Sequence, residues 1–283
     1  MASKITSSGY VLRDSVNLFY EREGKSGSRT VLFIHGLGGT TNSYQPLVSD
    51  LLDFDLVRFD FAGHGRSSVP SSSSVESYVA DCEDVISHLG LKDVVVVGHS
   101  FGGLISLHLA AKHPEIVKGV VTFGAVRPFP EAIQKALTTR SSIVRRQGMV
   151  AVADAVVSSA FSAKSLANRK AEVSFAREML TRQDPEGYAL AVDALAQSSA
   201  PVWSQINGKV IILSGDEDKV STLEVGADIV NDIGPNAQQV TCKDTGHWHM
   251  LESPDECIKA IISVASDESS WHGYASSKLG GTR

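Results

Sequence analysis

Short hydrophobic runs and helical patterns alternate along most of this chain. Four consecutive valines at residues 94–97 suit a strand that is buried on both faces, and the apolar residues at 104–111 then recur at helical spacing. The same succession predicts further strands within residues 30–39, 55–68, 117–126, 208–220 and 237–250, and further helices within residues 75–91, 223–233 and 254–266. This alternation predicts an α/β fold with a mostly parallel sheet and helices on both faces.

Two segments depart from the alternation. Residues 9–24 alternate apolar and polar side chains around a central turn, which predicts an antiparallel pair of edge strands. Residues 128–204 carry helical patterns and no strand, and Asp184 followed by Pro185 is typical of a helix start. We expect this helical insertion to form a cap over the carboxyl edge of the sheet, where open α/β folds bind their ligands.

These patterns divide the chain into three parts. Residues 1–127 and 205–266 are predicted to form the α/β core, and residues 128–204 are predicted to be inserted into it as the helical cap. Residues 267–283 are rich in Ser and Gly, and a segment of that composition is predicted to be a disordered tail.

Residues 98–102, Gly-His-Ser-Phe-Gly, lie where the valine strand gives way to a helix. In that context the G-x-S-x-G pattern is informative, because a sharp strand-to-helix turn lifts a serine hydroxyl out of the sheet edge. The glycines allow the chains to approach closely, and the serine can then adopt a strained backbone conformation. We therefore interpret Ser100 as a nucleophile rather than as an incidental serine in a glycine-rich turn.

A serine hydroxyl needs a base that removes its proton, and the base needs a third group that fixes its tautomer. His247 lies on a glycine-containing loop after the last predicted strand and is the favoured base, while His249 is its rival. The acid is expected at a strand exit between the serine and the histidine. We favour Asp218, which lies furthest out on the acidic loop, and interpret Asp216 as a turn-capping residue.

The oxyanion that forms during acyl transfer needs two N–H donors. One is expected to be the backbone N–H of Phe101, directly after the serine, and the other to come from the glycine-rich loop at residues 35–39, where we assign Leu37. Gly36 and Gly38 of the same loop are candidates for contact with the substrate. The loop lacks the Gly-Lys-Ser/Thr ending and the G-x-G-x-x-G spacing of phosphate-binding loops.

Composition and charge argue against nucleic acid and membranes as partners. A net charge of -6 and a pI near 5.8 supply no basic field for nucleic acid, and no apolar run approaches the ~20 residues of a membrane span. The first residues lack the apolar segment of a secretory signal, and the three cysteines are scattered. We expect a reduced, cytoplasmic protein without a disulfide framework or metal site, present as a monomer or homodimer.

The motifs, in their order along the chain, resemble the α/β-hydrolase family over about residues 9–265. They are HGLGG at 35–39, DFAGHGRS at 60–67, GHSFGG at 98–103, GDEDKV at 215–220 and GHWHMLESP at 246–254. The resemblance implies Ser100 as nucleophile, Asp218 as acid and His247 as base. It also implies structural roles for three residues of these motifs: Asp60, Glu252 and Pro254. His249 is unusual at its place in this family.

Within the family, the chain is most similar to 3-oxoadipate enol-lactonases and related small lactonases or esterases. The cap segments at residues 146–161 and 184–196 carry this closer resemblance. It implies hydrolysis of a small enol-lactone that carries a carboxylate, with no cofactor and no metal. A guanidinium group pairs with a carboxylate in bidentate geometry. The candidate substrate-binding arginines in or beside the cap are Arg127, Arg140, Arg145 and Arg146.

Other functions are built on the same fold and stay open at this point. Ser100 argues against dehalogenases and epoxide hydrolases, which use an aspartate nucleophile. A C–C bond hydrolase, a cofactor-free perhydrolase or a hydroxynitrile lyase could use the same three residues, and a hydrolase-like receptor would bind a small molecule with almost no turnover. The prediction is a serine hydrolase of a small lactone or carboxylic ester, with no nucleic acid or membrane partner.

Overall fold

The computed structural model describes residues 5–13 and 15–266, so the tail at 267–283 lies outside the described residues. Within the described chain, eight strands form one sheet in the order β1-β2-β4-β3-β5-β6-β7-β8. Neighbouring strands from β4 to β8 are parallel, whereas β2 is antiparallel to both β1 and β4. The predicted α/β fold with a mostly parallel sheet is confirmed.

Six strands of the sheet coincide with predicted apolar segments, and the other two correspond to the alternating segment at residues 9–24, although the first begins earlier, at Ile5. Their bounds are β1 (Ile5–Arg13), β2 (Val16–Gly24), β3 (Thr30–Ile34), β4 (Asp55–Phe59), β5 (Val94–His99), β6 (Val117–Phe123), β7 (Lys209–Gly215) and β8 (Ala237–Cys242). Every residue of β3, β4 and β5 is buried, because helices cover both faces of the sheet at its centre. Near-continuous apolar runs are therefore the pattern that these strands require.

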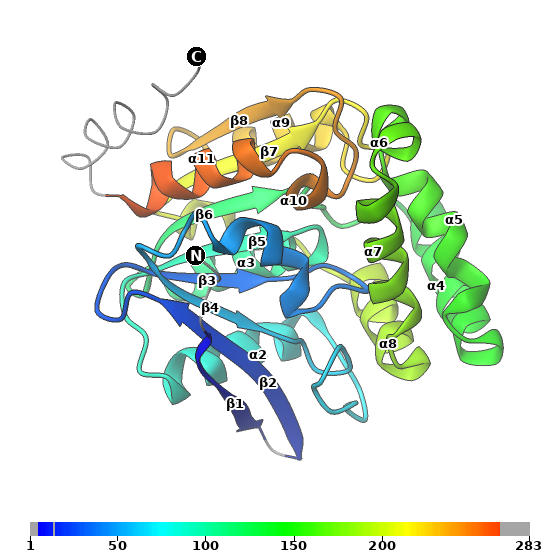
Figure 1. Cartoon of the computed structure of the whole chain (residues 1–283), viewed down its shortest axis with the longest axis horizontal. Coiled ribbons are helices and arrows are strands. Elements are labelled where there is room, and N and C mark those ends of the chain that lie inside the picture. The colour runs from blue at the N-terminus through cyan, green and yellow to red at the C-terminus, as the bar shows by residue number, and fades with distance from the viewer. Residues whose placement is uncertain (1–4, 14, 267–283) are drawn as a thin grey trace.

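Helices pack on both faces of the sheet (Figure 1). Helices α2 (Val75–His88), α3 (Phe101–Lys112) and α9 (Leu223–Ile233) cover one face, and α1 (Gln45–Val48) and α11 (Pro254–Ala265) cover the other. Two short helices near the site complete the core, η1 (Thr41–Tyr44) and α10 (His249–Glu252), and η2 (Trp203–Gln205) precedes β7. In the described chain, no helix combines the length and the apolar character that a membrane span requires.

The structure differs from the prediction in two details. β2 is not an edge strand, because β4 pairs with it on the side opposite β1, so that only β1 of this hairpin lies at the edge. The sequence patterns also do not predict η1, α1 and α10, which have four residues each. A helix of about one turn is too short to show an apolar period.

Helices α4 to α8 follow one another between β6 and β7 and stand beyond the carboxyl ends of the strands (green in Figure 1). Their bounds are α4 (Glu131–Gln147), α5 (Val150–Ala160), α6 (Ala163–Asn168), α7 (Lys170–Thr181) and α8 (Pro185–Ala196). The Asp184 carboxylate accepts hydrogen bonds from the N–H groups of Glu186 and Gly187, which confirms the predicted helix start. We call α4–α8 the cap; residues 128–204 as its boundaries remain a prediction.

Candidate active site

Ser100 occupies the sharp turn between β5 and α3. Its backbone has φ 54° and ψ −119°, a conformation that a residue with a side chain rarely adopts and that costs on the order of 1–3 kcal/mol. A Cβ on Gly98 would lie 2.2 Å from Ser106 Oγ, and a Cβ on Gly102 would lie 2.2 Å from the Ile34 carbonyl oxygen. The two flanking glycines are thus required by close approach, as the G-x-S-x-G pattern predicts.

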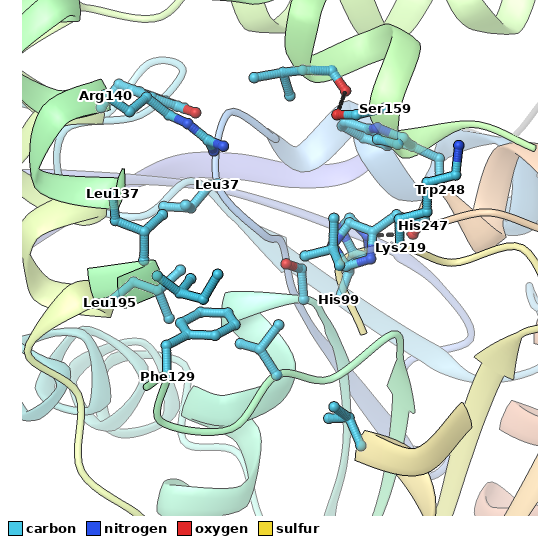
Figure 2. A pocket seen from close by; sticks show the side chains of 18 residues that line it. Leu37, His99, Phe129, Leu137, Arg140, Ser159, Leu195, Lys219, His247 and Trp248 are labelled. Atoms are coloured by element: carbon cyan, nitrogen blue, oxygen red, sulfur yellow. Dashed lines mark hydrogen bonds between the residues drawn. The ribbon is translucent and has the colours of Figure 1, made fainter. Parts of the chain in front are cut away.

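A cavity of about 380 Å³ separates the carboxyl ends of the strands from the cap, and its lining is drawn in Figure 2. Ser100 and His247 both lie on its wall. Most of the remaining lining is apolar: Leu37, Val126, Phe129, Ile133, Leu137, Val156, Ala160, Leu195, Val220, Val225 and Trp248. The arrangement offers a hydroxyl and an imidazole to a compact, largely apolar ligand.

The His247 imidazole is hydrogen-bonded to a buried carboxylate. Its Nδ1 lies 2.8 Å from Asp218 Oδ2, and the other carboxylate oxygen of Asp218 accepts hydrogen bonds from the N–H groups of Val220 and Ser221 at 2.8 and 2.9 Å. Burial by itself would raise the pKa of Asp218, but His247 and the Ser221 N–H outweigh burial, so the pKa of this carboxyl lies below its ordinary value. Asp218 therefore stays ionised and fixes the proton of His247 on Nδ1.

Gly124 makes room for this pair at the end of β6. Its φ is +54°, and a Cβ there would lie 2.9 Å from Asp218 Oδ2 and 3.0 Å from His247 Nδ1. No side chain fits at this position without displacing the carboxylate or the imidazole. The end of β6 thus provides room for the Asp218–His247 pair and supplies no functional side chain of its own at this position.

The two rivals of the favoured residues have other partners. Asp216 is exposed, and its carboxylate accepts a hydrogen bond from the Thr245 N–H at 3.2 Å, in keeping with a turn-capping residue. His249 is buried at the start of α10, where its Nδ1 lies 3.1 Å from the His247 carbonyl oxygen, and it does not line the cavity. The structure therefore brings together Ser100, His247 and Asp218.

Two backbone N–H groups beside Ser100 have no acceptor within the described residues, those of Leu37 and Phe101. Phe101 is the first residue of α3, and the first N–H groups of a helix have no partner in the helix. The Leu37 peptide is oriented by His35, whose Nδ1 donates to the Gly36 carbonyl oxygen at 2.8 Å while its Nε2 accepts from the Phe61 N–H at 3.0 Å. Burial, reinforced by His64, lowers the pKa of His35 to about 3, although the Gly36 bond opposes the shift, so this imidazole is neutral.

The glycine loop is also held by the cap. The buried side chain of Gln183, between α7 and α8, donates to the carbonyl oxygens of Gly38 and Gly39 at 3.1 and 3.3 Å and accepts from the Gly65 N–H at 3.1 Å. Gly38 has φ +72°, and a Cβ there would lie 2.3 Å from a methyl carbon of Leu180. Gly36 and Gly38 are therefore buried packing positions, and neither lines the cavity.

Of the four candidate arginines, only Arg140 lines the cavity. Its guanidinium lies near the Tyr188 hydroxyl, and within the described chain it has no carboxylate partner. Arg127 pairs with Asp228 and Asp232 of α9, and Arg145 pairs with Glu186 and Asp193 of α8. Arg146 is exposed on α4 and does not reach the cavity. The last turn of α4 directs its arginines outward, which the spacing of the sequence does not reveal.

The sequence analysis missed four polar cavity residues: His99, Ser159, Tyr188 and Lys219. Lys219 follows Asp218 on the same loop, and Figure 2 places it on the side of the cavity opposite Arg140. No local pattern distinguishes this lysine from a solvated one, because only the cap determines what the loop faces. Among the residues that the structure describes, no group of three or more His, Cys, Asp or Glu side chains is placed to hold a metal ion.

The structural roles implied for Asp60 and Glu252 agree with their contacts. The Asp60 carboxylate accepts from the N–H groups of Thr41 and Arg66 at 2.6 and 2.9 Å. The Glu252 carboxylate accepts from the N–H groups of Ser162 and Trp248 at 2.9 and 3.2 Å. Both acids are buried and hold loops on either side of the cavity.

Comparison with known proteins gives consistent results. The family described as alpha/beta hydrolase fold matches residues 29–254. Among curated proteins, 3-oxoadipate enol-lactonase 2 of Acinetobacter baylyi is 25% identical over 252 residues, which cover 88% of this chain and 93% of that protein.

Two solved structures share the fold across nearly the whole chain. An esterase from Thermogutta terrifontis matches with a TM-score of 0.85 and 23% identity, over 92% of this chain and 100% of that one. The enol-lactonase from Burkholderia xenovorans LB400 matches with a TM-score of 0.84 and 24% identity, over 92% and 100% of the two chains. At these identities the structural similarity establishes the fold alone.

Proposed function

Because the chain belongs to the alpha/beta hydrolase fold family, we propose that it is a serine hydrolase that opens small lactones or cleaves compact carboxylic esters. Ser100 is the nucleophile, His247 the general base and Asp218 the acid that orients it. One observation carries the proposal: the hydroxyl of a strained turn and an imidazole bonded to a buried carboxylate share one cavity. The resemblance to 3-oxoadipate enol-lactonase 2 supports the substrate class.

The chemistry follows from the roles of these groups. Ser100 Oγ attacks the ester carbonyl carbon while His247 Nε2 takes the hydroxyl proton, and Asp218 stabilises the imidazolium that forms. The N–H groups of Leu37 and Phe101 bind the oxyanion of the tetrahedral intermediate. His247 then returns the proton to the leaving oxygen, which stays tethered to the acyl group if the substrate is a lactone. Water, activated by the same imidazole, hydrolyses the acyl-enzyme.

The cavity supports a compact substrate with an acidic group. Its volume of about 380 Å³ suits a small molecule, and the cap roofs it, so a long acyl chain is disfavoured. Arg140 and Lys219 line it, whereas no Asp or Glu does, and neither cation forms an ion pair within the described residues. A carboxylate on the substrate would supply the missing partner for the Arg140 guanidinium.

The test is a turnover assay of the full chain with p-nitrophenyl esters of increasing acyl length beside small lactones, with and without a carboxylate. Steady multiple turnover of a compact ester or lactone is the expected result. Ser100→Ala should cost about 10³–10⁶ in kcat while the protein stays folded by circular dichroism. A fluorophosphonate probe should label the wild type and not this variant.

Three outcomes would contradict the proposal. Equal labelling of wild type and Ser100→Ala would exclude Ser100 as the nucleophile. Binding of small esters without turnover would favour a receptor. Turnover confined to C–C bond substrates, or to peracid formation with hydrogen peroxide, would favour the alternative enzymes with the same three residues.

A further inference from the structure

The main chain of His247 is hydrogen-bonded to three separate parts of the molecule. Its N–H donates to the Ala160 carbonyl oxygen at the end of α5, at 2.6 Å. Its carbonyl oxygen lies 2.8 Å from His99 Nε2 and 3.1 Å from His249 Nδ1. Two imidazoles, one from the residue before Ser100 and one from the start of α10, thus meet on a single carbonyl oxygen.

The direction of these bonds determines both tautomers. A carbonyl oxygen only accepts hydrogen bonds, so the nitrogen facing it must carry the proton in each ring. His99 is therefore protonated on Nε2, and His249 is protonated on Nδ1. Each contact uses one lone pair of the carbonyl oxygen, and together the two donors satisfy it completely.

Both imidazoles are buried, and in the part of the chain that the structure describes each has one ring nitrogen without a hydrogen-bond partner. Within the described residues, His99 Nδ1 and His249 Nε2 have no hydrogen-bond partner. A buried polar atom without a partner is destabilising, and a leucine of similar size would avoid that penalty. Burial also lowers the pKa of both histidines, so the rings are neutral donors. Their hydrogen bonds to the His247 carbonyl oxygen offset the free-energy cost of burying the two unpaired nitrogens.

We propose that His99 and His249 are positioning residues that hold the His247 main chain so that its imidazole stays in reach of Ser100. The inference rests on the proposed function, because it assigns a purpose to the position of the base. His99 is the critical link, since it is covalently adjacent to Ser100 and bonded to the backbone of His247. The nucleophile and the base are therefore coupled directly rather than through the rest of the sheet.

The residues around this link leave it little freedom. A Cβ on Gly36 would lie 2.9 Å from His99 Nδ1, and the His99 ring centroid is 5.3 Å from that of Trp248. The His249 ring stacks on Phe123 with centroids 6.3 Å apart. Both rings are thus wedged in place, and each presents only one nitrogen to His247. Loss of either donor would release the carbonyl oxygen and let the loop shift.

The experiment uses side-chain amides that place a donor at one of the two ring positions. Asn reproduces a donor at Nδ1 and Gln reproduces a donor at Nε2, whereas Leu supplies none. We expect His99→Leu and His249→Leu to lower kcat roughly 10- to 100-fold with little change in KM, as small displacements of catalytic groups do. His99→Gln and His249→Asn should recover most of that loss. His99→Asn and His249→Gln should stay as low as the leucine variants.

The crossed pattern separates positioning from packing. If all polar variants behave alike at a given site, or if the leucine variants keep wild-type kcat, the proposal is overturned. His88→Gln, at an exposed histidine on α2, is the control for removing an imidazole elsewhere. Thermal unfolding of each variant identifies any that fails to fold, and the donor-retaining partner at the same site then provides the comparison.

A second measurement does not depend on activity. Two-bond ¹H–¹⁵N spectra of the wild-type protein report which nitrogen of each histidine carries the proton. We expect the proton on Nε2 for His99 and on Nδ1 for His249, and the opposite tautomer for either ring would overturn the inference. Fluorophosphonate labelling of Ser100 distinguishes the two failures. A wild type that is not labelled contradicts the proposed function, whereas equal labelling rates in wild type and leucine variants contradict the positioning role alone.

Discussion

Asp216 and Asp218 lie two residues apart on the loop after β7, yet their carboxylates meet different partners. Asp218 is buried against His247 Nδ1 at 2.8 Å, while Asp216 is exposed and accepts from the Thr245 N–H. At the scale of the residue, the role of each carboxylate depends on whether the loop directs it toward His247 or toward solvent. The same holds for His247 and His249, of which only the former lines the cavity.

The two carboxylates should differ sharply in their contribution to catalysis. Asp218→Asn presents an amide to Nδ1 and favours the wrong tautomer of His247, so we expect a loss of up to ~10⁴ in kcat. Asp216→Asn is the matched control and should leave kcat close to that of the wild type. Steady-state kinetics on the best ester decides between them. A larger loss in Asp216→Asn would show that the assignment of the acid is reversed.

The buried carboxyl group of Asp60 leads us to predict a pH dependence of stability. Burial raises the pKa of Asp60 to about 6, although the N–H groups of Arg66 and Thr41 oppose the shift. The folded state therefore binds a proton at pH values where the unfolded chain, with an ordinary pKa near 3.8, does not. By linkage, the contribution of Asp60 to stability rises as pH falls through 6 and decreases as pH rises.

Asp60→Asn removes this titration and isolates its effect. Between pH 7.5 and pH 4, the free energy of unfolding of the wild type minus that of the variant should grow by on the order of 2 kcal/mol in favour of the wild type. Urea unfolding at several pH values measures it. A difference that grows toward high pH would contradict the raised pKa.

At the scale of the element, the cap and the core are joined at the two loops that carry the site. Gln183 at the α7–α8 junction bonds the glycine loop at Gly38 and Gly39 and the turn at Gly65. On the other side, the Ala160 carbonyl oxygen at the end of α5 accepts the His247 N–H. The cap is therefore part of what holds the two loops that carry the proposed oxyanion donors and the proposed base, besides forming the roof of the cavity.

Gln183→Leu tests the first of these junctions. The leucine fills a similar volume but leaves the carbonyl oxygen of Gly38 and the N–H of Gly65 without their partner. We expect the free energy of unfolding to fall by about 1–3 kcal/mol and kcat to fall as the glycine loop loosens. Urea unfolding and ester kinetics are the measurements. Gln197→Leu, at an exposed glutamine at the end of α8, should change neither quantity.

At the scale of the whole molecule, the proposed selectivity for a carboxylate depends on surfaces that meet only after folding. The cavity lies between strand ends and cap helices, and its two cations, Arg140 and Lys219, come from segments far apart in the sequence. Figure 2 shows them on opposite sides of the site. Because the two cations lie on opposite sides, the carboxylate of a ligand with one acidic group would pair with only one of them.

Arg140→Leu should therefore weaken selection for charge more than catalysis itself. We expect kcat/KM for a carboxylated lactone to fall roughly 10- to 100-fold, in line with the loss of a charge-assisted hydrogen bond, and kcat/KM for its methyl ester to change little. Arg146→Leu is the matched control, since Arg146 lies on the same helix outside the cavity. If kcat/KM fell equally for the carboxylated lactone and its methyl ester, Arg140 would not bind the substrate carboxylate.

Much of this protein follows from its local sequence. The apolar runs determine the strands of the sheet, because a strand buried on both faces must be apolar along its length. The sharp turn at Ser100 is marked in the sequence by Gly98 and Gly102. A Cβ on Gly98 would meet Ser106 and Gly102 a few residues further along, whereas a Cβ on Gly102 would meet Ile34 of β3. The helix start at Asp184 is likewise a local interaction between a side chain and the next backbone N–H groups.

Other features were decided only by the tertiary structure. Arg140 faces the cavity while Arg145 and Arg146, on the same helix, do not, because the packing of α4 against α8 determines which side of the helix is covered. The two imidazoles that donate to the His247 carbonyl oxygen belong to His99, which lies 148 residues from His247 along the chain, and to His249, which lies 2 residues from it. A hydrogen bond across the fold depends on the orientation of both partners, and packing against distant elements sets that orientation.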